Sequence, residues 1–244
     1  MTTRLTVLDP SGIDDFPAVV KALDYPNGLL AAGGDLSVER LLLAYRHGIF
    51  PWYSEGEPIL WWSPDPRMVF RTNRMHVPSR LARLLRKCTW QVRADTAFRD
   101  VMCACAQPRP NQPTTWISDD MLDAYGELHD VGHAHSIEVF DGEALIGGIY
   151  GVALGRMFFG ESMFGKVSGA SKVALLALSH ALAMWRWPLL DAQVQSDHLE
   201  SLGAKTITRA EFVEELAGLV EQQGATGSWT TRFPLIDVRH LGVR

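Results

Sequence analysis

The chain has few cysteines and no apolar run of membrane length. Its three cysteines are Cys88, Cys103 and Cys105, and they form no C-x-x-C pair, which excludes a disulfide framework, a zinc ribbon and a thioredoxin-like motif. The longest apolar stretches, such as 173–178, are far shorter than the roughly 20 residues that cross a bilayer. The segment MTTRLTVLDPSG at the start lacks the features of a signal peptide. We therefore predict a soluble, cytoplasmic protein with reduced cysteines.

The sequence also lacks the usual nucleotide-binding and nucleophile motifs. It contains no GxxxxGK[ST] phosphate loop, no strand–GxGxxG–helix unit and no GxSxG elbow. Any activated group must therefore arrive already activated. His129, His133 and His135 follow an H-x-x-x-H-x-H spacing, which is a weak metal-ligand pattern with no evident fourth ligand. We expect neither a cofactor nor a metal.

Apolar side chains are plentiful, and charge is unevenly distributed. Of 244 residues, 47% are hydrophobic and 21% are charged, which suits one large domain or two small ones with a full core. The formal net charge is −5, yet residues 67–109 carry ten basic side chains and only two acidic ones. A basic segment in an acidic protein predicts a face that binds a polyanion.

The first 65 residues are rich in Gly, Pro and Trp. We predict a helix over 38–47, capped by Ser37 and stopped by Gly48. The segment PWYSEGEPILWWSPDPR (51–67) then contains four prolines and three tryptophans. Because tryptophans need packing partners or a ligand, this composition indicates an ordered lobe and not a linker.

After residue 67 the pattern predicts alternating helices and strands. Strands joined by tight turns are expected within 135–164, and a helix over 96–106 is expected to be capped by Asp95. The other predicted helices are 80–88, 118–131, 169–185 and 209–222, and the other strands are 89–94, 188–195 and 205–208. We predict an α+β fold with a mixed sheet flanked by helices. Its expected domains are 1–66, small and Trp/Pro-rich, and 67–244, catalytic.

Polar side chains stand out in two apolar segments. Asp191, Gln193 and Gln195 share one face of the predicted strand 188–195, where burial without partners is unfavourable. They belong either to a structural hydrogen-bond network or to a functional site. Glu161 lies in FFGESMF (158–164) and is either a site carboxylate or a buried acid paired with an arginine.

A basic stripe runs along the predicted helix 80–88. Such a stripe is usually a solvated helix face, but here it lies in a strongly basic segment of a tryptophan-rich protein. Arginines near exposed rings can hold phosphates and stack bases of a single-stranded end, which favours contact with nucleic acid. The residues concerned are Arg80, Arg83, Arg86, Lys87, Trp52, Trp61, Trp62 and Trp116.

Ten stretches, taken in order, closely resemble one family, the leucyl/phenylalanyl-tRNA–protein transferases of bacteria. They are PNGLLAAGGDLS (26–37), YRHGIFPWY (45–53), WWSPDPR (61–67), TWI (115–117), GHAHSIEV (132–139), GGIYG (147–151), FFGESMF (158–164), GASKVALL (169–176), LLDAQV (189–194) and HLESLGA (198–204). Such a set is far more specific than any single motif. The tail after about 224 and parts of 68–115 match weakly.

The resemblance implies an activity and a fold. Family members transfer Leu, Phe or Met from the 3′ end of an aminoacyl-tRNA to the α-amine of a protein that begins with Arg or Lys, and the new N-terminal residue marks that protein for degradation. The implied fold is a small N-terminal domain followed by a domain like the GNAT acyltransferases. The expected partners are leucyl-, phenylalanyl- or methionyl-tRNA and proteins with N-terminal Arg or Lys. We expect a monomer that uses no cofactor and binds no membrane.

The resemblance also assigns catalytic residues: Asp191 and Gln193 as a catalytic pair, with Glu161 beside them. About a tenth of a free α-amine is neutral at pH 7, so the reaction needs positioning and donors for the oxyanion more than a strong base. In the implied mechanism Asp191 orients the Gln193 amide, which contacts the amine or the carbonyl oxygen. Glu161 is assigned to a substrate ammonium or the adenosine ribose.

Other matching positions are assigned to substrate binding. Phe158, Met163 and Leu190 match an apolar pocket for the transferred side chain, in which a flexible Met admits Leu, Met and Phe. Trp52 and Trp116 match aromatic residues expected to hold the terminal adenosine, and Tyr45 and Tyr125 match family positions near the site. For the acceptor stem of the tRNA we select Arg83, Arg86 and Lys87 from the basic stripe.

Other functions remain open on the sequence alone. KVSGAS (166–171) loosely resembles the loop with which GNAT acetyltransferases hold coenzyme A, although its first and last residues favour an ordinary helix start. A coenzyme A-dependent acetyltransferase is therefore one alternative. Another is a non-enzymatic module that binds tRNA or degradation signals, which would need Asp191 and Gln193 only for folding. A tRNA-dependent transferase acting on acidic N-termini or cell-wall peptides is a third.

Overall fold

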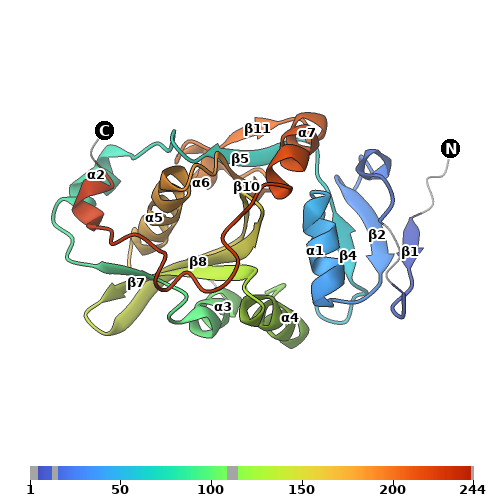
Figure 1. Ribbon diagram of the computed structural model, residues 1–244, viewed down its shortest axis with the longest axis horizontal. Helices are drawn as coiled ribbons and strands as arrows, with labels where there is room; N and C mark the ends of the chain where they lie inside the picture. Colours follow the sequence, from blue (N-terminus) through green and yellow to red (C-terminus); the bar gives the residue numbers. More distant parts are fainter. Residues whose placement is uncertain (1–4, 13–15, 109–114, 243–244) are drawn as a thin grey trace.

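The computed structural model describes residues 5–12, 16–108 and 115–242 and contains two sheets (Figure 1). The smaller sheet has the strand order β1-β2-β4-β3. Its strands are β1 (Thr6–Leu8), β2 (Leu29–Gly33), β3 (Phe50–Pro51) and β4 (Leu60–Trp62). Helix α1 (Val38–Arg46) stands between this sheet and the rest of the molecule and contacts β8, α4 and α7.

The larger sheet has the strand order β11-β5-β10-β9-β8-β7-β6. Its strands are β5 (Arg67–Arg71), β6 (Gln91–Ala94), β7 (Ala134–Asp141), β8 (Ala144–Leu154), β9 (Met157–Gly165), β10 (Leu189–Gln193) and β11 (Lys205–Ile207). Strands β9 and β10 run parallel, and every other neighbouring pair is antiparallel. The sheet is therefore mixed, which confirms the α+β class.

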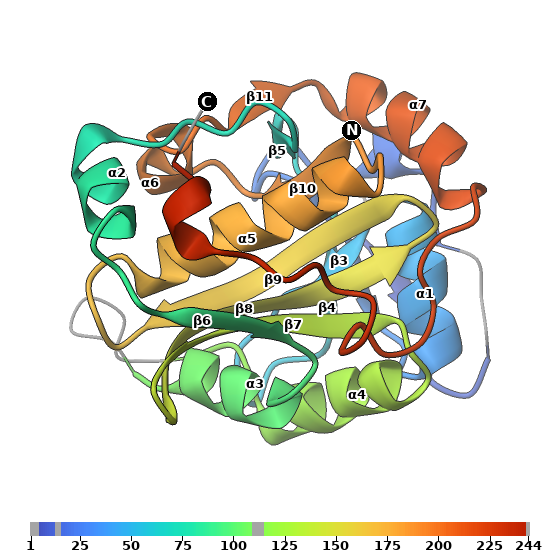
Figure 2. The ribbon, with the colours of Figure 1, turned by 60° about the vertical axis from the view of Figure 1, so that its left-hand side comes forward.

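Helices cover both faces of this sheet. Figure 2 shows α5 (Ala170–Met184) crossing one face, with α3 (Phe98–Ala106) and α4 (Asp119–Asp130) beneath the other. The remaining helices are α2 (Ser79–Leu85), α6 (Asp197–Glu200) and α7 (Arg209–Val220). Within the described part of the chain, no helix is both long and apolar enough to cross a membrane.

Local signals place most helix ends. Ser37 accepts a hydrogen bond from Arg40 N at the start of α1, and Ser118 accepts one from Met121 N at the start of α4, as the cap patterns predict. The predicted cap of α3 is wrong. Its N-cap is Ala97, without a side-chain bond, because the carboxylate of Asp95 instead accepts backbone N–H groups of Ser136 (2.9 Å) and Trp229 (2.6 Å).

The core has two parts, one on each face of the larger sheet. The part on the α5 face includes Phe158, Leu190 and Trp229, and the other part includes Phe159. Strand β9 thus packs on both faces, with Met157, Phe158 and Phe159 buried and Glu161 half-buried, so a polar residue within it needs partners in the protein. The second part also holds side chains from before and after residue 66. The division into domains at that residue stays a prediction, as does the GNAT-like character of the second one.

Candidate active site

The candidate site lies where β9 and β10 stop pairing. The parallel ladder joins Leu190 to Phe158 and Asp191 to Phe159, and it ends there. Both strands are irregular at this point. On β9 the register against β8 steps over Glu161, and on β10 the register against β5 steps between Asp191 and Gln193. Bulges of this kind re-aim side chains beside active sites.

Glu161, the extra residue on β9, is held by three side chains from other elements. Its Oε1 accepts hydrogen bonds from the Tyr45 hydroxyl (2.7 Å) and from Gln193 Nε2 (2.8 Å). Its Oε2 accepts one from the Tyr125 hydroxyl (3.2 Å), and the two tyrosine hydroxyls also bond to each other. Helices α1 and α4 therefore bring the tyrosines to the end of the β9–β10 ladder.

This enclosure shifts the protonation of Glu161. Burial raises the pKa of its carboxyl to about 7, and the Asp191 charge adds to the rise, while the hydrogen bonds from Tyr45, Tyr125 and Gln193 act against it. Burial also raises the pKa of both tyrosines well above the usual value, so they remain hydroxyl donors. The Glu161 carboxyl therefore gains or loses its proton in the neutral pH range, as ionisable groups at functional sites often do.

Asp191 forms a fully buried ion pair with Arg67, and both side chains are 0% exposed. Arg67 donates from Nε to Oδ1 (2.8 Å) and from Nη2 to Oδ2 (2.6 Å). Asp191 Oδ1 also accepts the backbone N–H of Gln193 (2.9 Å). The sequence leaves open that Glu161 is a buried acid paired with an arginine. In the structure Asp191 forms such a pair, whereas Glu161 is bonded to Tyr45, Tyr125 and Gln193.

The contacts of this strand differ from the expectation at two points. Asp191 contacts Gln193 through its backbone N–H, and the side-chain amide of Gln193 donates to Glu161. The single face predicted for Asp191, Gln193 and Gln195 is wrong, because the register step puts Asp191 opposite Val69 and Gln193 opposite Met68, and because β10 ends at Gln193, whose φ is 61°. The Gln195 amide instead donates to Glu200 (2.8 Å) in an exposed position. A left-handed residue breaks the period-two alternation on which the prediction depended.

A small apolar cavity of about 100 Å³ adjoins Gln193 and Glu161. Met163 and Leu190, which the family resemblance assigns to the transferred side chain, both line it. Phe158 does not; it is 1% exposed and packs against the Trp229 ring with centroids 5.8 Å apart. Sequence reasoning missed five further apolar lining residues, because their residue types are those of ordinary core positions: Phe70, Ile149, Leu175, Ala192 and Leu199.

The tryptophans assigned to the adenosine lie on neighbouring segments. Trp52 is 43% exposed, and its carbonyl accepts the indole N–H of Trp62 (2.6 Å). Trp116 is half-buried two residues before Ser118, whose side chain acts against the burial that raises the pKa of the nearby Tyr53 hydroxyl. The segment that carries Trp52 therefore adjoins the segment that carries Trp116, on the side of the molecule where α1 and α4 meet.

The basic residues assigned to the tRNA stand apart from this cluster. Arg83, Arg86 and Lys87 are exposed on and just after α2. Figure 1 shows α2 at the opposite end of the large sheet from α1. Arg86 and Lys87 share a surface hollow with Arg239 from the C-terminal segment. The structure thus leaves them on an open face and does not join them to Glu161.

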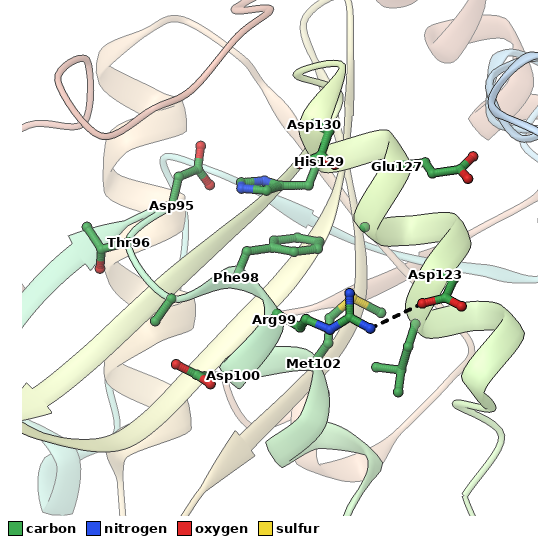
Figure 3. A pocket seen from close by; sticks show the side chains of 13 residues that line it. Asp95, Thr96, Phe98, Arg99, Asp100, Met102, Asp123, Glu127, His129 and Asp130 are labelled. Atoms are coloured by element: carbon green, nitrogen blue, oxygen red, sulfur yellow. Dashed lines mark hydrogen bonds and ion pairs between the residues drawn. The ribbon is translucent and has the colours of Figure 1, made fainter.

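A larger hollow, of about 580 Å³, lies between α3 and α4 (Figure 3). Its wall includes an ion pair between Arg99 and Asp123 (3.1 Å) and the ring of His129 stacked on Phe98 (4.2 Å between centroids). His133 and His135 have separate partners, Ala153 O and Asp95. Among the described residues, no three His, Cys, Asp or Glu side chains group closely enough to hold a metal.

Comparison with known protein families matches two parts of the chain to the same family. The sequence model described as leucyl/phenylalanyl-tRNA protein transferase matches residues 69–217, and the model of that family's N-terminal domain matches 34–65.

Three curated relatives are each named leucyl/phenylalanyl-tRNA–protein transferase. The chain is 60% identical to the one from Xanthomonas euvesicatoria pv. vesicatoria, over 94% of this chain and 92% of the relative. It is 56% identical to one from Xanthomonas campestris pv. campestris (strain B100), over 93% and 92%. It is 54% identical to that of Xylella fastidiosa, over 93% and 94%. The chain therefore belongs to the leucyl/phenylalanyl-tRNA–protein transferase family, a family of aminoacyltransferases.

Proposed function

We propose that this protein transfers Leu, Phe or Met from the 3′ end of an aminoacyl-tRNA to the α-amine of proteins that begin with Arg or Lys. The residue added at the N-terminus would then mark the product for degradation. The observation that carries the proposal is the junction of the apolar cavity with the Gln193–Glu161 pair. With the side chain of the transferred amino acid in the cavity, the ester carbonyl of that amino acid would lie beside the Gln193 amide, which Glu161 holds in place.

The reaction mainly requires that the α-amine and the ester carbonyl be held in the correct relative position. The α-amine attacks the ester carbonyl, a C–N bond forms, and the C–O bond to the terminal ribose breaks. The amine loses a proton and the ribose oxygen gains one. Because Gln193 Nε2 is engaged by Glu161, the amide oxygen is directed to the other side, where it can accept an N–H of the attacking amine. Gln193 would act by orientation and polarisation, since an amide does not titrate in this range.

Glu161 would set the geometry of this amide and supply charge close to the reacting groups. As a carboxylate it accepts from Tyr45, Tyr125 and Gln193 together. The tyrosine donors would keep the carboxylate in one orientation while substrates exchange. Its negative charge also favours an ammonium group at the site, which is the form in which much of the acceptor α-amine arrives at neutral pH.

The RNA would bind through rings and cations. Trp52 offers an exposed ring for the terminal adenosine, with Trp116 on the adjoining segment. The exposed cations Arg83, Arg86 and Lys87 would contact phosphates of the acceptor stem, so activity should fall steeply with added salt. We propose a cytoplasmic monomer that needs neither cofactor nor metal.

The test is transfer of labelled leucine from purified leucyl-tRNA to peptides beginning with Arg, Lys, Asp or Ala, without ATP or coenzyme A. Transfer to the Arg and Lys peptides alone would support the proposal. Transfer to the Asp peptide would mean that acceptor choice differs from the proposal. A folded sample that binds the tRNA but transfers to no peptide would contradict the proposed reaction.

A further inference from the structure

Arg67 is a buried cation that the proposed transfer mechanism does not use. It is the first residue of β5, and its side chain is 0% exposed. Taking a guanidinium out of water is unfavourable unless its donors and charge are matched. Here they are matched by a bidentate bond to Asp191 and by the Gly48 carbonyl, which accepts from Nη1 (3.0 Å).

The guanidinium connects the N-terminal lobe to the strand that carries Gln193. Gly48 lies just after α1, the helix that supplies Tyr45. The guanidinium also stacks on the rings of Phe50 in β3 (4.9 Å) and Phe212 in α7 (4.5 Å). The Arg67 side chain thus contacts the residue after α1, strand β3 and helix α7 while it is paired with Asp191 of β10.

Asp191 accepts three hydrogen bonds in this arrangement. Its two oxygens accept the Arg67 fork, and Oδ1 also accepts the Gln193 backbone N–H. Its side chain is 0% exposed, so the carboxylate is not open to a substrate. Its contact toward the reacting groups therefore runs through the backbone of Gln193.

Gln193 adopts a backbone conformation that a side chain disfavours. Its φ is 61°, in the left-handed region that residues other than glycine seldom occupy. Residues held in such conformations persist only where neighbouring groups determine them. The hydrogen bond from the Gln193 N–H to Asp191 is such a restraint, and Arg67 fixes the rotamer of Asp191 that provides it.

We propose that Arg67 is a positioning residue for aminoacyl transfer. By fixing the side chain of Asp191, Arg67 keeps the backbone of Gln193 in the left-handed region. The Gln193 amide can then donate to Glu161 and present its oxygen to the acceptor α-amine. The inference rests on the proposed function, since it concerns the rate of that reaction. It predicts that the effect of Arg67 on the rate passes through Gln193.

The first variant is Arg67→Lys, which keeps the charge but replaces the planar fork with a point donor. We expect kcat for leucine transfer to an Arg-starting peptide to fall about 100-fold, because small misplacements of a reacting group have effects of that size. The KM for leucyl-tRNA should change less than about twofold, since Arg67 touches no substrate. A matched control is Arg71→Lys, on the same strand, which alters a bidentate pair with Glu215 (2.5 and 2.6 Å) remote from Gln193. It should retain kcat.

The second arm separates positioning from general structure by a double-mutant cycle. In a Gln193→Ala background, Arg67→Lys should change kcat by less than about twofold, because the group that it positions is gone. A merely structural role would lower kcat by the same factor in both backgrounds. That result, or full kcat in Arg67→Lys alone, would overturn the inference.

Arg67→Lys could fail to fold, so a neutral pair provides a second route. Arg67→Met combined with Asp191→Asn removes both buried charges at similar volume, a replacement that proteins often tolerate. It should lower kcat in the native background and leave kcat unchanged in the Gln193→Ala background; full kcat in the native background would again overturn the inference. If the unmodified protein transfers nothing, the proposed function fails. If it transfers normally and only these variants behave otherwise, the inference alone fails.

Discussion

The two sides of β9 differ sharply beside the end of β10. One side is polar: Glu161 meets the hydroxyls of Tyr45 and Tyr125 and the amide of Gln193. The other side is an apolar cavity that Met163 helps to line. The bulge at Glu161 produces this contrast, because it sends a carboxylate toward α1 and α4 while Met163, two residues later, packs on the α5 side. We therefore expect the polar side to set the rate of transfer and the apolar side to set the choice of amino acid.

The largest effect should come from removing the amide on the polar side. Gln193→Ala is expected to lower kcat for leucine transfer about 100-fold or more, in the range for loss of an oriented donor or acceptor at a reacting carbonyl. Gln195→Ala is the matched control, because the Gln195 amide faces Glu200 in solvent. It should keep kcat within about twofold. Equal kcat values for the two variants in single-turnover assays would remove Gln193 from the reaction.

The next effect is the pH dependence of the polar side. Glu161 has a pKa raised to about 7, so it gains a proton, and loses acceptor capacity, as the pH falls through neutrality. Between pH 8 and pH 6 we expect the transfer rate to fall about tenfold more in the native protein than in Glu161→Gln, whose profile should follow only the acceptor amine. Single-turnover rates with one peptide across this range provide the measurement. Parallel profiles would show that Glu161 does not control the rate.

On the apolar side, a change of cavity size should alter the choice of donor. Met163→Ala enlarges the cavity and should raise the ratio of kcat/KM for phenylalanyl-tRNA over leucyl-tRNA by about tenfold, the scale on which apolar pockets discriminate. Phe158→Leu is the control on the same strand, since Phe158 packs on Trp229 outside the cavity. An altered donor ratio in Phe158→Leu, with none in Met163→Ala, would reverse the assignment of these two residues.

The smallest expected effect concerns the tyrosines. Tyr125→Phe removes one hydrogen bond to Glu161 and should lower kcat about fivefold, in line with about 1 kcal/mol for such a bond. Tyr150→Phe removes a buried hydroxyl that has no hydrogen-bond partner among the described residues. It should leave kcat unchanged in the same assay. Similar losses in both variants would indicate that packing of the rings, and not donation to Glu161, controls the rate.

Local patterns in the sequence correctly predicted much of the fold. Ser37 and Ser118 cap the expected helices, and the three-strand meander and the long buried helix α5 appear where turns and apolar runs place them. These features depend on neighbours within a few residues, so short-range rules suffice. Asp95 shows where such rules fail. A side chain that could cap the next helix is instead committed to Trp229, 134 residues away.

Within the site, the sequence singled out Glu161, Asp191 and Gln193 by itself, because polar side chains in otherwise apolar strands require partners. The family resemblance assigns roles to these residues but does not identify their hydrogen-bond partners. Only the tertiary structure decided the partners. Tyr45 lies 116 residues from Glu161, and Arg67 lies 124 residues from Asp191. The left-handed turn at Gln193 also depends on that distant ion pair, and residue types along one strand do not encode it.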